Sequence, residues 1–222
     1  MDYFWLIAAL LLAFVDWFAV ARKLKPLEYI AKPGVMVALL LWLVTNGGTA
    51  GPILWFAIGV FHSMIGDIFL MLPRVRLIPG IIAFAIAHLA YLGGFFPSVP
   101  PIAPVGLLFF LLVTAAAVAL YPRIAAGLER SGQTKLKTPV LIYTIIISLM
   151  LLAALFTLVR PEWNPSAAWL AATGALLFFI SDSLLAWNRF VAPLPFGKLP
   201  EISAYHLGQI LLSLGAGLQY LS

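Results

Sequence analysis

Two stretches determine the fold: GVFHSMIGDIFLM at residues 59–71 and GALLFFISDSLLA at residues 174–186. In each, an apolar run carries one aspartate, Asp67 or Asp182, eight residues after a glycine. Apolar runs of roughly 20 residues span the hydrocarbon core of a bilayer. A carboxylate inside such a run is costly unless it faces a partner or a cavity, and it marks a candidate functional site. Both stretches therefore predict membrane-spanning helices with a functional carboxylate.

The composition of the whole chain indicates an integral membrane protein. Of its 222 residues, 64% are hydrophobic and only 9% are charged, far from the balance of soluble domains. The net charge of +5 fits lipid headgroups and topology determination, so we expect no nucleic-acid binding. The chain has no cysteine, which excludes disulfides, thiol nucleophiles, iron–sulfur clusters and cysteine-ligated zinc.

The length rule predicts eight membrane-spanning helices in one domain. They cover residues 3–21, 29–46, 52–72, 77–96, 101–121, 139–159, 166–187 and 201–221. The second is the weakest, because its strictly apolar part runs only from Pro33 to Thr45, and a seven-span alternative stays open. The first ends in a basic cluster rather than a cleavage site, so we expect a retained helix and not a signal peptide. Breaks are expected at Gly47-Gly48, Pro73, 97–101 and 193–200.

The basic residues predict the orientation of the chain. Short loops rich in Lys and Arg stay in the cytoplasm, and all but one of the 13 basic residues fall near the odd-numbered loops. These are Arg22, Lys23, Lys25, Lys32, Arg74, Arg76, Arg123, Arg130, Lys135, Lys137, Arg189 and Lys198. The even loops hold only Arg160. Both termini are therefore expected on the non-cytoplasmic side, and the minimal loops favour a prokaryotic inner membrane.

Matched features four helices apart predict an internal repeat. Besides the two aspartate segments, Lys32-Pro33 corresponds to Lys137-Thr138-Pro139, and AHLAY at 87–91 corresponds to AYHLGQ at 204–209. An even offset gives both halves the same orientation, so we expect two parallel four-helix repeats, about 1–100 and 101–222, related by an axis along the membrane normal. The repeat is imperfect, since Ser181 stands where Gly66 stands.

Polar residues converge in the cytoplasmic half of these helices. They are Asp16, Lys32, Asp67, Asp182, Tyr205, His206 and Gln209, with His88 deeper. Asp16 has an alternative partner in Arg22 or Lys23, and Lys32 has an alternative role as an interfacial anchor. Two carboxylates in an apolar site tend to differ in protonation, which suits hydrolysis of an amphiphile such as a lysolipid. Histidine and carboxylate also suit zinc, but no local ligand spacing supports a metal, and we expect no cofactor.

Several of these segments together resemble the YhhN-like lysoplasmalogenase family. The resemblance extends from about Lys32 to the C-terminus. It rests on Lys32-Pro33, Gly66-Asp67, His88, Tyr91, Ser181-Asp182 and Tyr205 to Gln209. It implies a membrane enzyme that hydrolyses the vinyl ether bond of lysoplasmalogens, yielding a fatty aldehyde and glycerophosphoethanolamine or glycerophosphocholine.

The implied reaction assigns roles to the polar residues. A vinyl ether hydrolyses when an acid protonates its β-carbon and water captures the resulting cation. One of Asp67 and Asp182, kept neutral by burial, would supply the proton, and the other would stabilise the cation or activate water. Lys32 would hold the phosphate. The remaining candidates, which would position water or the glycerol end, are His88, Tyr91, Tyr205, His206 and Gln209.

Two other functions stay open on the sequence alone. One is a metal-dependent lipid amidase or esterase of the alkaline-ceramidase type, which would use histidines and aspartates around zinc. The other is a small-molecule or lipid carrier, because parallel repeats and buried aspartates also occur in transporters. Against a carrier, the ionisable residues gather toward one face of the membrane.

Overall fold

The computed structural model describes residues 1–72, 75–96 and 104–221. Within these ranges the chain is all helical and has no strand. The α-helices are α1 (Phe4–Ala21), α2 (Lys25–Thr45), α3 (Pro52–Met71), α4 (Leu77–Phe95), α5 (Pro104–Arg130), α6 (Lys137–Phe156), α7 (Pro165–Phe190) and α8 (Leu199–Tyr220). The predicted breaks at Pro73 and 97–101, together with Arg74 and the start of the predicted span 101–121, lie outside the described residues.

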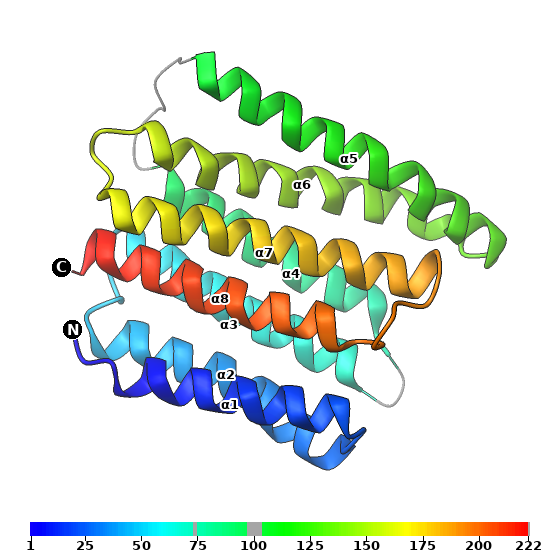
Figure 1. Ribbon diagram of the computed structural model, residues 1–222, viewed down its shortest axis with the longest axis horizontal. Coiled ribbons are helices and arrows are strands. Elements are labelled where there is room, and N and C mark those ends of the chain that lie inside the picture. The colour runs from blue at the N-terminus through cyan, green and yellow to red at the C-terminus, as the bar shows by residue number, and fades with distance from the viewer. Residues whose placement is uncertain (73–74, 97–103, 222) are drawn as a thin grey trace.

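The helices lie side by side, and the chain passes along the bundle repeatedly. Both termini lie at one end, and the connections from α1 to α2, α5 to α6 and α7 to α8 lie at the other (Figure 1). In the described part of the chain, seven helices, α1 to α7, are long and apolar enough to cross a membrane. α8 has 22 residues, but its polar residues place it outside that group. The chain is therefore a multi-pass integral membrane protein.

Several helices begin or end elsewhere than the hydropathy predicts, most clearly α2 and α5, and α7 also extends past Arg189 to Phe190. α2 begins at Lys25 and has 21 residues, so the predicted weak span is a complete helix. α5 continues through Pro122 to Arg130, so Arg123 and Arg130 lie on the helix and not in a loop. The reason is that the stretch after Pro122 is rich in Ala, Leu, Glu and Arg, which favour helix independently of hydropathy.

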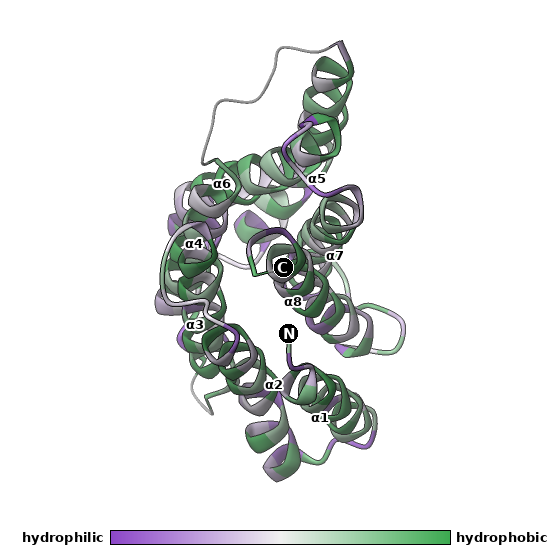
Figure 2. Cartoon of the chain, turned by 90° about the vertical axis from the view of Figure 1, so that its left-hand side faces the viewer, coloured by the Kyte–Doolittle hydropathy of each residue, from purple (hydrophilic) through white to green (hydrophobic). Residues whose placement is uncertain are grey.

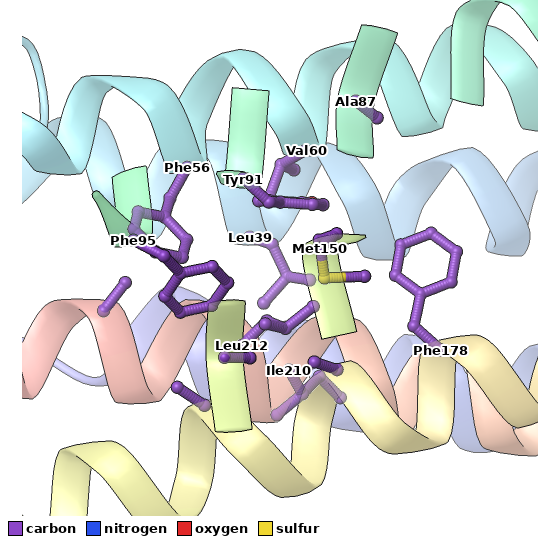
Figure 3. Close-up of a cluster of buried hydrophobic side chains, with 14 of the residues drawn as sticks. Leu39, Phe56, Val60, Ala87, Tyr91, Phe95, Met150, Phe178, Ile210 and Leu212 are labelled. Atoms are coloured by element: carbon purple, nitrogen blue, oxygen red, sulfur yellow. The ribbon is translucent and has the colours of Figure 1, made fainter. Parts of the chain in front are cut away.

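Six helices form a ring in the order α2, α3, α4, α6, α7 and α8, with α8 returning to α2. α1 packs outside the ring on α2 and α8, and α5 packs outside it on α6 and α7. The view along the helices shows this arrangement (Figure 2). The interior contains a large apolar core, in which Leu39, Phe56, Met150, Phe178 and Leu212 are buried together (Figure 3).

The contact between α7 and α8 is unusually close because glycines line it. A Cβ atom on Gly174 would lie 2.5 Å from the backbone nitrogen of Leu212, and one on Gly215 would lie 2.7 Å from that of Ala171. Small residues at such interfaces let helix backbones approach each other directly. Ser181 adds a hydrogen bond across the same interface, since its hydroxyl donates to the backbone oxygen of Glu201 at 2.8 Å. The polar residues on α7 and α8 are thus held at fixed positions relative to each other.

Candidate active site

Asp67 lies in a buried cluster of three side chains from three helices. The Lys32 ammonium on α2 lies 2.8 Å from Asp67 Oδ1 on α3. The Tyr205 hydroxyl on α8 donates to Asp67 Oδ2 at 2.6 Å. The Lys32 ammonium also lies 5.5 Å from the centre of the Tyr205 ring. A buried charge persists only with such a partner and additional hydrogen bonds, so this geometry favours an ionised carboxylate paired with an ammonium.

Asp182 has different neighbours. The Tyr143 hydroxyl on α6 donates to Asp182 Oδ2. Nε2 of His88 on α4 lies 2.9 Å from the Tyr143 hydroxyl and 3.4 Å from Asp182 Oδ2. The Asp182 side chain is 15% exposed, whereas that of Asp67 is 2% exposed. Among the described residues Asp182 forms no ion pair with a lysine, and it is the more accessible of the two carboxylates.

The ring of Phe178 lies close to both clusters. Its centre is 4.6 Å from that of His88 and 5.3 Å from that of Tyr205. The two carboxylates are near enough to interact electrostatically. The fold therefore brings the two predicted aspartates into one region but gives them different environments.

Two more predicted residues form a link deeper in the bundle. The Tyr91 hydroxyl on α4 donates to Oε1 of Gln209 on α8 at 2.6 Å. Both side chains are fully buried. This hydrogen bond joins α4 in the first half of the chain to α8 in the second half. Gln209 lies one helical turn after Tyr205, on the side of the carboxylate clusters toward the termini.

His206 and Asp16 take part in none of these hydrogen bonds, although both lie near Lys32. The His206 ring stacks on Trp17 of α1 at 6.5 Å, and neither ring nitrogen has a hydrogen-bond partner among the described residues. Asp16 is fully buried. Within the described ranges Asp16 forms no ion pair with Arg22 or Lys23, the alternative partners that the sequence offered.

Asp182 and Tyr143 line an apolar pocket of about 80 Å³. Its remaining walls come mainly from apolar side chains of α3 to α7, among them Leu70, Phe84 and Leu185. An apolar lining of this kind suits contact with a hydrocarbon chain.

A second pocket of about 240 Å³ is polar and is lined by residues of α2, α3, α7 and α8 and by Lys198 between the last two helices. The connection from α7 to α8 lies at the end of the bundle opposite the termini (Figure 1). Its ionisable residues are Glu28, Lys32, Arg189, Lys198 and Glu201. Leu70 and Leu185 line both pockets. The two pockets are therefore adjacent. The apolar one matches the hydrocarbon chain of a single-chain amphiphile, and the charged one matches its headgroup.

Tyr143 and Glu201 are the site residues that the sequence did not single out. A tyrosine in an apolar helix is usually an interfacial belt residue, and the repeat gives no signal because Val37 follows Pro33 where Tyr143 follows Pro139. A glutamate beside Lys198 looks like an ordinary loop charge. Over residues 1–72, 75–96 and 104–221, no group of three or more His, Asp or Glu side chains is arranged to hold a metal ion.

Comparison with known proteins gives consistent matches. The model of the YhhN family matches residues 27–216. Lysoplasmalogenase TMEM86B of Mus musculus is 36% identical over 186 residues, covering 83% of this chain and 72% of the relative. Its counterpart in Homo sapiens is 32% identical over 202 residues, covering 91% and 76%. A lysoplasmalogenase of Mycobacterium tuberculosis is 27% identical over 168 residues, covering 72% and 59%. No solved structure matches the chain.

Proposed function

Because the chain belongs to the YhhN family, we propose that it is a lysoplasmalogenase, a membrane hydrolase that cleaves the vinyl ether bond of lysoplasmalogens to a fatty aldehyde and a glycerophospho compound. The observation that carries this proposal is the pair of adjacent pockets, one apolar and one charged, with Asp182 in the wall of the apolar one. The expected substrate is a lysolipid from the surrounding bilayer.

The polarity of the two pockets orients the substrate. The alkenyl chain occupies the apolar pocket, and the phosphate-bearing headgroup occupies the polar one. The vinyl ether bond then lies near Leu70 and Leu185, where the pockets adjoin. The β-carbon of the vinyl ether is on the chain side of the bond, and the ether oxygen is on the headgroup side.

This orientation assigns the acid. The proton must reach the β-carbon, and Asp182 is the carboxyl group that lines the chain pocket. In its neutral form Asp182 transfers its proton to the β-carbon, and the alkene becomes an oxocarbenium ion. The Asp182 carboxylate left behind accepts the hydrogen bond from Tyr143. General acid catalysis of this kind contributes typically about 10²–10⁴-fold to a rate.

Water completes the reaction. It attacks the cationic carbon and loses a proton to the Asp182 carboxylate, which regenerates the acid. The resulting hemiacetal breaks its carbon–oxygen bond to the glycerol, and the hydroxyl proton passes to the departing oxygen. The products are the aldehyde and the free glycerol hydroxyl. The reaction consumes one water molecule and no other reactant.

Asp67 stays ionised in this scheme. Lys32 and Tyr205 hold its carboxylate in place, and its negative charge stabilises the oxocarbenium ion. Lys32 has three N–H donors, so it can bind the substrate phosphate while it retains Asp67. His88 orients Tyr143 and Asp182, whereas Tyr91, Gln209 and His206 support the helices around the site.

The substrate is tested with two lysolipids that differ in one bond. The purified protein is incubated with a lysoplasmalogen and with the saturated ether analogue of the same chain and headgroup, and the products are identified by mass spectrometry. We expect aldehyde from the vinyl ether alone, because only the alkene accepts a proton at carbon. Cleavage of both lipids, or transport of the lysolipid without cleavage, would refute the proposal.

The repeat and the topology are part of the same proposal. Exchanging α2 with α6, α3 with α7 and α4 with α8 maps every contact of the six-helix ring onto another contact of the ring, which supports two parallel repeats, about 1–100 and 101–222. We propose that all eight helices cross a bacterial inner membrane. The basic loops and the polar pocket then face the cytoplasm, where positive loops are retained.

Single cysteines test the orientation without background, because the chain contains none. Ser131 after α5 and Thr49 after α2 are both exposed and lie near opposite ends of the bundle. In intact cells, an impermeant maleimide should label Thr49→Cys but not Ser131→Cys, and permeabilised cells should show both. The reverse pattern would contradict the proposed orientation.

A further inference from the structure

We propose that Glu201 binds the ammonium group of the substrate headgroup, so that the enzyme prefers a primary ammonium, as in ethanolamine, over the quaternary ammonium of choline. This inference rests on the proposed function and concerns the polar pocket. It adds to that function a residue that distinguishes between two headgroups.

Glu201 is a buried residue of the pocket wall, and the surrounding structure fixes its position. It is 5% exposed and lies in the first turn of α8. Its backbone oxygen accepts the hydrogen bond from Ser181, so its position is fixed against α7. Its carboxylate oxygen Oε2 is buried and has no hydrogen-bond partner in the described part of the chain. Buried carboxylate oxygens are normally bonded, so this one is available to a ligand.

The other charges of the pocket fit the rest of a zwitterionic headgroup. Glu28 is paired with Lys25 at 2.6 Å and Lys32 with Asp67 at 2.8 Å. Arg189 and Lys198 form no close ion pair with any described residue. Lys198 lies near enough to Glu201 to act on its charge, and the Asn188 side chain is hydrogen-bonded to Glu201. The free oxygen of Glu201 is thus the carboxylate oxygen left for the ammonium of the substrate. Arg189 and Lys198 can bind the phosphate together with Lys32, since both residue types bind phosphate well.

The walls of the pocket favour ammonium hydrogens over methyl groups. A primary ammonium has three N–H donors and can donate to a buried carboxylate. A quaternary ammonium has none, and proteins typically bind it in a cage of aromatic rings. The described residues that line this pocket include no aromatic side chain. Choline would therefore leave Oε2 of Glu201 without a donor.

The test compares headgroups on one alkenyl chain. The purified full-length protein in lipid bilayers is given lysoplasmenylethanolamine, its N-methyl and N,N-dimethyl derivatives, and lysoplasmenylcholine, and kcat/KM is measured for each. We expect kcat/KM to fall stepwise with methylation, roughly tenfold from ethanolamine to choline. In Glu201→Gln, the value for ethanolamine should fall to near that for choline, while the choline value changes less than about twofold.

Glu129→Gln is the matched control, because Glu129 lies at the same end of the bundle, is half exposed and pairs with Lys137 outside the pocket. It should keep the wild-type preference. Equal kcat/KM for all headgroups in the wild type, a preference for choline, or equal loss for all headgroups in Glu201→Gln would overturn the inference while leaving the proposed function intact. Failure of the wild type to cleave any vinyl ether would instead refute the proposed function. The methylation series needs only the wild type, so misfolding of the variant would not prevent the test.

Discussion

Asp182→Asn is expected to lower the rate of aldehyde release by about 10²–10⁴-fold, the range typical for loss of a general acid. Asparagine keeps the size of the side chain and accepts the hydrogen bond from Tyr143, but it cannot donate a proton to carbon. The loss should appear in kcat, because the alkenyl chain and the headgroup keep their pockets. It is measured by following aldehyde formation from lysoplasmenylethanolamine at saturating substrate.

Two variants complete this experiment. Tyr143→Phe removes the hydroxyl that contacts Asp182 but leaves the acid, so it should reduce kcat by less than Asp182→Asn does. Asp2→Asn makes the same chemical change at an exposed position near the N-terminus, far from both pockets, and should keep full activity. Full activity of Asp182→Asn would rule out the proposed acid.

Lys32→Met is expected to destabilise the protein strongly. It leaves the Asp67 carboxylate buried without its cation, and breaking a buried pair from one side costs about 3–5 kcal/mol. The double variant Lys32→Met and Asp67→Leu removes both charges and should recover most of the stability without recovering activity. The measurement is the unfolding midpoint in detergent, read from the helical circular dichroism signal.

Lys137→Met provides the comparison for this result. Lys137 pairs with Glu129, but both side chains are substantially exposed, with 33% and 56% of their areas accessible. Pairs of that kind contribute less than about 1 kcal/mol, so the midpoint should barely move. If Lys32→Met were as stable as Lys137→Met, the buried ion pair between Lys32 and Asp67 would not stabilise the fold.

The helices could be predicted from the sequence because each depends on local hydropathy. The apolar runs around Asp67 and Asp182 correspond to α3 and α7, and the alternation of basic and non-basic loops agrees with the alternating ends of the bundle (Figure 1). Hydropathy does not predict the continuation of α5 to Arg130, because helix propensity maintains this part of the helix.

The partners of each aspartate could not be predicted, because they depend on which helices meet in the ring. His88, from the first half of the chain, contacts Asp182 in the second half, and Tyr205, from the second half, contacts Asp67 in the first. Sequence matching between the halves identifies equivalent positions but not these crossed contacts. For the same reason the sequence does not identify Tyr143, whose hydroxyl reaches Asp182 only because α6 lies beside α7.

The shared wall of the two pockets at Leu70 and Leu185 affects what happens after the bond breaks. The apolar pocket holds the aldehyde and the charged pocket holds the glycerophospho product, so each fragment is already in the surroundings that match its solubility. The aldehyde dissolves in lipid and its former partner dissolves in water. Once the two products are in different phases they rarely meet again, so their dilution favours hydrolysis over the reverse reaction. The aldehyde can leave through apolar surroundings and the glycerophospho product through polar ones.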